Sequence, residues 1–284
     1  MDRRQHWRAG KTAVTVGLVV GLGACATGCG GARAEGVGGS PGDNPVTLLK
    51  RTADTLRATR TSKATTSMEM ATGGTRVTIR GKGVYDYDRQ LGRLTVVLPQ
   101  DPAGASEHRP ITELLAPGAL FMKNRGAGVP ADKWVRVETA TLSDGNLVTG
   151  GATDPFAAAE LLRGTRTATY VGETDLAGTE VRHYRGTADL AAAARSASAG
   201  DRAALAAAAK GFATPEVPFD VYLDDQGRIR KLRQRFSFVN DSGKGTVAVA
   251  STTLLYGFGT PVDVKLPRSE DIYAGRIAEN QPTH

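Results

Sequence analysis

The feature of this sequence that most limits its fold is a series of strand-like segments joined by very short turns. Near the end of the chain, residues 217–223, 229–239 and 246–258 each have the pattern of a strand. The turns between them span only residues 224–227 and 241–245. Parallel strands need a connection of about a dozen residues or more, so these segments must pair in antiparallel fashion.

The middle of the chain continues this pattern. Between Arg76 and Tyr87 apolar and polar side chains alternate, and Gly81 and Gly83 fall on the apolar face. Glycine inside a strand marks a bend or a close approach of another backbone, so we expect this strand to curve. Further strands are expected at residues 67–70, 93–98, 119–124, 133–138, 167–173 and 181–187.

Three helical segments accompany the strands. The pair Asn44-Pro45 is typical of a helix start, and Asp154-Pro155 starts a short helix over 156–163. The alanine-rich stretch 190–210 is expected to be helical, with a break at Gly200-Asp201. These helices are too few to cover both faces of a parallel sheet. The sequence therefore predicts an α+β fold, in which a large curved antiparallel sheet collects a few helices on one face.

Residues 46–272 are long enough to form this domain around a single core. Residues 273–284 are expected to be a frayed C-terminal tail, and a long loop at 142–153 has no recognisable pattern.

The amino terminus predicts export. A basic stretch from Arg3 to Lys11 precedes a run of thirteen uncharged residues, Thr12 to Ala24. As a helix this run would be about 20 Å long, shorter than the hydrocarbon core of a bilayer at about 30 Å. A charged region, a short apolar region and small residues form the layout of a secretory signal, so residues 1–24 are read as a signal peptide. Arg3-Arg4 leaves the export route open between the general and the twin-arginine pathway.

The signal ends at a cysteine. Leu22-Gly-Ala-Cys25 resembles the lipobox of bacterial lipoproteins, and this resemblance implies a diacylglyceryl group on Cys25 and cleavage before it. Ala26-Thr-Gly-Cys29 is the alternative, with a weaker first residue. Residues 25–45 then form a flexible tether rich in glycine and proline. The match to G-x-S-x-G at residues 38–42 lies in this tether, without the strand and helix that a hydrolase elbow needs.

Composition and motifs argue against several classes of function. The net charge is +7, of which the first 24 residues carry +3, and the rest is too scattered to indicate a nucleic-acid partner. His108, His183 and His284 have no cysteine, histidine or carboxylate at the spacing of metal ligands. Asp224 and Asp225 precede Gln226-Gly227, an order that favours a hairpin turn over catalytic carboxylates. We expect no metal, no cofactor and no catalytic site.

A basic segment is concentrated near the end of the chain. Such a segment usually forms a solvated face or an edge protected against pairing, and a patch for lipid headgroups or anionic wall polymers is the alternative. Its members are Arg228, Arg230, Lys231, Arg233 and Arg235.

Several segments together carry a resemblance to a known family. They are the opening helix running into residues 61–68, the strand 81–87 with its partner 94–98, residues 180–187, and residues 217–232 with 256–262. With these segments, most of the domain resembles the actinobacterial LppX/LprG-type lipoproteins, relatives in fold of the LolA lipoprotein carriers. This resemblance implies a LolA-like half-barrel wrapped around a few helices, with a hydrophobic cavity that takes acyl chains in the characterised members.

The inward side chains of such a sheet either line a cavity or simply form the core, and the sequence leaves both open. The candidates for the lining are Val77, Ile79, Leu94, Val96, Leu98, Val221, Leu223, Phe236 and Phe238.

The favoured function is that of a non-catalytic lipoprotein on the outer face of the cytoplasmic membrane. It would be anchored through its diacylglyceryl-cysteine and would bind or carry a lipid, a lipoglycan or another apolar ligand. The alternative is a surface interaction module for an envelope or membrane protein, contacted through residues such as Arg230 and Arg233, with no internal ligand.

Overall fold

The computed structural model describes residues 44–72, 74–99, 109–126, 128–239 and 246–275. Contacts divide the chain into two units, Met1–Glu35 and Gly36–His284, and the second unit contains every described helix and strand. The described strands are β1 (Thr61–Thr72), β2 (Thr75–Asp86), β3 (Leu91–Val97), β4 (Ile111–Ala116), β5 (Ala119–Lys123), β6 (Trp134–Glu138), β7 (Thr165–Asp175), β8 (Glu180–Asp189), β9 (Glu216–Leu223), β10 (Ile229–Val239) and β11 (Thr246–Tyr256). The described helices are α1 (Pro45–Lys50), α2 (Thr52–Ala58), α3 (Pro155–Leu161), α4 (Leu190–Ser196) and α5 (Ala199–Gly211), with 3-10 turns at η1 (Thr139–Thr141), η2 (Leu162–Gly164) and η3 (Ser269–Asp271).

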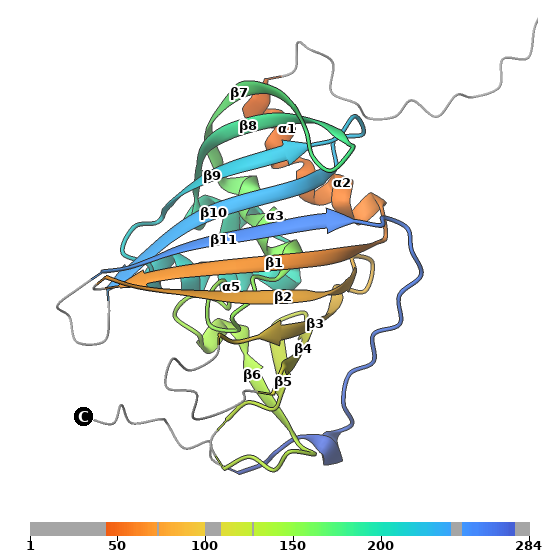
Figure 1. Ribbon diagram of the computed structural model, residues 1–284. Helices are drawn as coiled ribbons and strands as arrows, with labels where there is room; N and C mark the ends of the chain where they lie inside the picture. The colour runs from red at the N-terminus through yellow and green to blue at the C-terminus, as the bar shows by residue number, and fades with distance from the viewer. Residues whose placement is uncertain (1–43, 73, 100–108, 127, 240–245, 276–284) are drawn as a thin grey trace, which may run out of the picture. The chain divides into compact units, whose positions relative to one another are not determined.

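The strands form one sheet in the order β6-β5-β4-β3-β2-β1-β11-β10-β9-β8-β7. Every neighbouring pair is antiparallel, and β1 joins the two halves of the sheet by pairing with both β2 and β11. The sheet is open and curved, with α3 and α5 behind its strands in Figure 1. The α+β fold with a curved antiparallel sheet that the sequence predicts is confirmed.

Side-chain capping sets the start of several helices. The Asn44 carboxamide accepts the Val46 N–H at 2.9 Å, and the Asp154 carboxylate accepts the N–H groups of Phe156 and Ala157. The alanine-rich stretch breaks at Ala197–Ser198, between α4 and α5, and not at Gly200-Asp201. The break lies there because Glu160 accepts the Ser198 N–H at 2.7 Å, which ties the start of α5 to α3.

The inner face of the sheet, which meets the helices, carries the core. Leu94 and Val96 of β3, Val221 of β9 and Met68 of β1 are buried against the helices. A Cβ atom added to Gly83 would lie 1.8 Å from the backbone oxygen of Arg93, so glycine permits the close approach of β2 and β3. Close approach is one of the two roles expected for glycine in this strand.

The outer face of β3 to β6 is also covered. A small apolar cluster here includes Leu91, Leu114 and Phe121, and the segment after β11 packs on it through Val264 and Ile272. Ile272 forms an isolated bridge with Trp134 of β6. The sequence does not predict β4, because a strand that is buried on both faces shows no alternation of apolar and polar residues.

Among the described helices none is long and apolar enough to cross a membrane.

Candidate functional site

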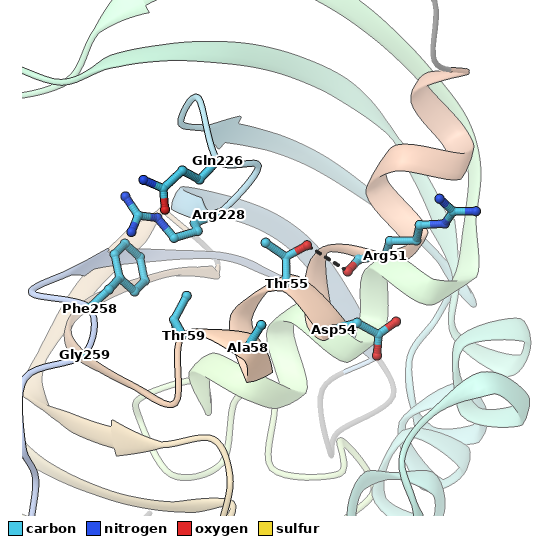
Figure 2. Close-up of a pocket in the computed structure, with 9 residues that line it drawn as sticks. All are labelled: Arg51, Asp54, Thr55, Ala58, Thr59, Gln226, Arg228, Phe258 and Gly259. Atoms are coloured by element: carbon cyan, nitrogen blue, oxygen red, sulfur yellow. Dashed lines mark hydrogen bonds between the residues drawn. The ribbon is translucent and has the colours of Figure 1, made fainter. Parts of the chain in front are cut away.

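A pocket of about 770 Å³ opens between α2 and the strand ends at one rim of the sheet (Figure 2). One wall is the C-terminal half of α2, and the other is the β9–β10 turn together with the residues that follow β11. The lining residues are Arg51, Asp54, Thr55, Ala58, Thr59, Gln226, Arg228, Phe258 and Gly259.

The helical wall presents apolar atoms although it contains threonines. The Thr55 hydroxyl donates to the Arg51 carbonyl at 3.3 Å, and the Thr59 hydroxyl donates to the Leu56 carbonyl at 2.6 Å. Both hydroxyls are therefore occupied by the helix itself. In Figure 2 the side chains of Thr55, Thr59 and Ala58 lie across the pocket from Arg228 and Phe258.

The opposite wall is a stack of arginine side chains on an aromatic ring. The Arg228 guanidinium lies 4.6 Å from the centre of the Phe258 ring, and its Nε donates to buried Asp224 at 2.8 Å. Arg230 also approaches the same ring, at 5.5 Å. Asp224 and the ring engage both cations, so this wall offers an aromatic ring beside two guanidinium groups that already have partners.

The charged residues at the edge of the pocket are directed elsewhere. Asp54 forms two hydrogen bonds with Arg163, at 2.6 and 3.0 Å, and these bonds hold the Asp54 pKa below its ordinary value against the opposing effect of burial. In Figure 2 the side chains of Arg51 and Asp54 point away from Phe258. The interior of the pocket is thus suited to an apolar group, and its volume lies in the range of about 300–1,000 Å³ typical of small-molecule sites.

A second pocket, of about 430 Å³, lies at the opposite rim. Arg228 precedes β10 and Phe238 is near its end, so the two pockets are separated by roughly 30 Å along this strand. Its apolar lining consists of Met70, Ile79, Leu98, Val148, Phe212 and Phe238, and its polar lining includes Arg125, Ser143, Asp144 and Thr149.

The loop 142–153 forms one wall of this second pocket. Asp144 organises the loop by accepting the N–H groups of Asn146, Val148 and Thr149 and the Thr149 hydroxyl. Arg125 fastens it from outside by donating to the Thr149 carbonyl at 3.2 Å. The loop is therefore a defined structure held by polar bonds at its centre.

Glu113 of β4 is buried next to this loop, and its carboxylate differs from that of Asp144 in its hydrogen bonding. Neither of its carboxylate oxygens accepts a hydrogen bond within the described part of the chain. Burial raises the Glu113 pKa to about 8, although the nearby Arg125 opposes the shift. Glu113 is thus a carboxyl group favoured in its neutral form at pH 7.

The nine residues predicted to line a cavity lie in different parts of the domain. Ile79, Leu98 and Phe238 come together at the second pocket. Val77 is half-buried, and Phe236 is buried in the core with an edge at a shallow surface pocket beside β9. Four residues are packed in the core: Leu94, Val96, Val221 and Leu223.

Sequence reasoning missed the larger pocket because its walls are a helix end and a turn. Alternation along strands identifies inward side chains, whereas Ala58, Gln226 and Phe258 lie outside the strands. Arg228 belonged to the basic segment, but nothing in the sequence places it on an aromatic ring. Cys25 and Cys29 lie outside the described residues.

Within the described part of the chain no group of three or more histidine, cysteine, aspartate or glutamate side chains could hold a metal ion. The described cluster around His183 lies on the outer face of the sheet, where its Nε2 meets Asp220 at 2.9 Å and its ring stacks on Tyr222.

No protein-family model matches the chain, and no curated protein matches it. Solved structures do match. Lipoprotein LppX from Mycobacterium tuberculosis is 9% identical with a TM-score of 0.44, over 78% of this chain and 97% of that one. LprF from Mycobacterium bovis is 13% identical with a TM-score of 0.38, over 81% and 99%. A LolA-superfamily protein from Nitrosomonas europaea is 11% identical with a TM-score of 0.33, over 75% and 94%. The chain is thus similar to solved lipoproteins and LolA-superfamily proteins, while the function proposed below rests on its own geometry.

Proposed function

We propose that this chain is a membrane-anchored extracytoplasmic lipoprotein that binds or carries a lipid or another apolar ligand without catalysis. The observation that carries the proposal is the pocket of about 770 Å³ between α2 and the strand ends. Threonine methyl groups, Ala58 and the Phe258 ring supply its inner surface, and an apolar ligand gains free energy by leaving water for such a surface.

The amino terminus supports the location. A diacylglyceryl group on Cys25, or alternatively on Cys29, would bury two acyl chains, and two chains give a stable anchor where one does not. The tether up to residue 45 would then hold the domain beside the outer leaflet, where lipids are at high local concentration.

The absence of a catalytic constellation around the pocket supports a holder over an enzyme. The described pocket walls pair no nucleophile with a base, since the hydroxyls of Thr55 and Thr59 bond to helix carbonyls. The carboxylates of Asp54 and Asp224 are both bound to arginines. These two hydroxyls and two carboxylates thus hold the walls in place.

The first experiment looks for a resident ligand. The unit Gly36–His284, purified from its native host and examined by native mass spectrometry, is expected to carry compounds with acyl chains. A uniformly empty protein would contradict the proposal and would favour the interaction module instead.

The second experiment locates the ligand. Ala58 is exposed on α2, so Ala58→Trp fills the pocket without disturbing the core. Binding of cis-parinaric acid, a fluorescent fatty acid, is expected to weaken at least tenfold. Ala203→Trp, at an exposed position of α5 away from the described pockets, is the matched control and should bind as the unmodified protein does. Equal binding by both variants would exclude this pocket as the site.

A further inference from the structure

Six cationic side chains share the open part of the outer face of the sheet. We call this set the basic face: Arg80 and Lys82 of β2, Arg185 of β8, and Lys231, Arg233 and Arg235 of β10.

Strand register places the cations in continuous rows. Arg80 is paired with Ser67, Ser67 with Thr252, and Thr252 with Arg233. Arg233 is paired in turn with Asp220, and Asp220 with Arg185. Directly paired residues point to the same side of a sheet, so these residues form one row from β2 to β8. A second row runs through Lys82, Thr65, Leu254 and Lys231, and a third through Glu69, Ala250 and Arg235.

The face has a surplus of positive charge. The three rows contain six cations and two carboxylates, Glu69 and Asp220. Asp220 accepts hydrogen bonds from Arg185 at 2.9 Å and from Arg235 at 2.8 Å, which fixes both guanidinium groups on the surface. Their side chains nevertheless stay 64% and 43% exposed, so both can reach a partner. Asp220 thus orients two cations without neutralising the face.

Protection of a sheet edge does not explain these cations. Lysine and arginine often guard an edge strand against pairing, but β10 is paired with β9 and β11, and β2 is paired with β1 and β3. The other half of the same face offers a comparison, because beneath Val264 and Ile272 it is apolar. The outer face is therefore covered over this apolar cluster, whereas its open part carries the cations and exposed Val97, which is paired with Arg80.

We propose that the basic face docks on the surface of a bilayer that contains anionic phospholipid. The row from β2 to β8 crosses five strand spacings, about 24 Å, and the residues between the cations are mostly small, such as Thr65, Ser67 and Thr252. Cations spread over this width, with small side chains between them, can contact many lipid headgroups at once. One small molecule would reach only a few of them. Attraction of this kind contributes a separate free energy for each lysine or arginine near the surface.

The length of chain before the domain is consistent with this occupant. Between Cys25 and Asn44 lie eighteen residues of flexible composition, whose ends would be about 25 Å apart on average. A bilayer that held the cysteine would then be within reach of the sheet. The proposal takes the membrane location from the proposed function but does not need the pocket.

Vesicle binding tests the proposal. The unit Gly36–His284, which lacks both candidate anchor cysteines, is sedimented with vesicles of phosphatidylcholine alone or of equal parts phosphatidylcholine and phosphatidylglycerol. We expect binding to the mixed vesicles only, weakening as salt is added. The double variant Arg80→Gln/Lys82→Gln removes two exposed cations that form no hydrogen bond or ion pair with the described residues, and it should weaken binding about 30-fold, at roughly fivefold for each cation.

A matched variant separates the face from net charge. Arg195→Gln/Lys210→Gln removes two exposed cations from α4 and α5 and should change binding less than twofold. Equal loss in both double variants, or equal binding to vesicles without phosphatidylglycerol, would overturn the proposal. Binding to soluble polyglutamate without binding to vesicles would overturn it too, in favour of an anionic polymer. Ala58→Trp should keep full vesicle binding, so a failure of docking and a failure of ligand carriage give different results.

Discussion

Replacing Glu113 with glutamine should stabilise the protein at neutral pH. The Glu113 side chain is fully buried, and neither oxygen accepts a hydrogen bond from the described residues. Burial raises its pKa from an ordinary 4.5 to about 8, with Arg125 opposing the shift. A buried charge without partners is costly, and glutamine keeps the shape while it removes the charge.

The expected size of the effect follows from linkage. The folded-state pKa lies above the unfolded one, so this group's contribution to stability is complete below about pH 4.5 and is lost as the pH rises toward 8. At about 1.4 kcal/mol per pKa unit, the loss at pH 7 is about 3 kcal/mol. Glu113→Gln should therefore differ little from the unmodified protein at pH 4.5 and gain about 3 kcal/mol at pH 7.

Urea unfolding at a series of pH values measures this difference. Asp144→Asn is a suitable comparison, because Asp144 is also buried but accepts four hydrogen bonds from its own loop. That variant should lose about 2 kcal/mol, the cost of weakening hydrogen bonds to a charged group. If Glu113→Gln were no more stable than the unmodified protein at pH 8, the carboxylate would have a partner and the reasoning would fail.

Three further predictions concern other parts of the chain. Arg163→Ala should destabilise the domain by about 3 kcal/mol in thermal or urea unfolding, because it leaves the buried Glu160 carboxylate without its ion pair. Gly83→Ala should cost about 3 kcal/mol in the same assay, since its Cβ would collide with the backbone of β3. Cys25→Ser should abolish acylation and membrane fractionation, whereas Cys29→Ser should preserve both; mass spectrometry of the mature amino terminus decides between the two acceptors.

The sequence predicts most of the sheet because alternation and turns are local signals. The ends of β9, β10 and β11 lie within two residues of the expected ones. The sequence predicts only residues 67–70 as a strand here, whereas β1 begins at Thr61. The prediction is too short because two of the buried side chains, Ser62 and Thr66, are polar and break the expected alternation. The first residues of β1 are held in the strand by pairing with β2 and β11, and a pairing with β11 cannot be read from a local pattern.

The pockets show a different limit of sequence reasoning. Ile79, Leu98 and Phe238 were expected to face inward, and they do meet at one pocket, but their neighbours in the core have the same pattern. Whether an inward side chain lines a space depends on what packs against it from the helices and loops. Alternation identifies the face, whereas only tertiary packing determines where the face is left uncovered.

Strand β10 contributes to both proposed sites, because its inward side chains belong to the core beneath the ligand pocket and its outward side chains belong to the basic face. Its inward residues Leu232 and Phe236 lie in the core, and Gln234 donates to the Ala158 carbonyl at 3.0 Å, which ties the sheet to α3. Its outward residues Lys231 and Arg233 belong to the basic face. A slip of one residue in register would exchange the two sets, so the same pairing that closes the core also specifies the charge of the outer face. Because the sets point in opposite directions, an outward substitution can change docking while the packing beneath the ligand pocket stays intact.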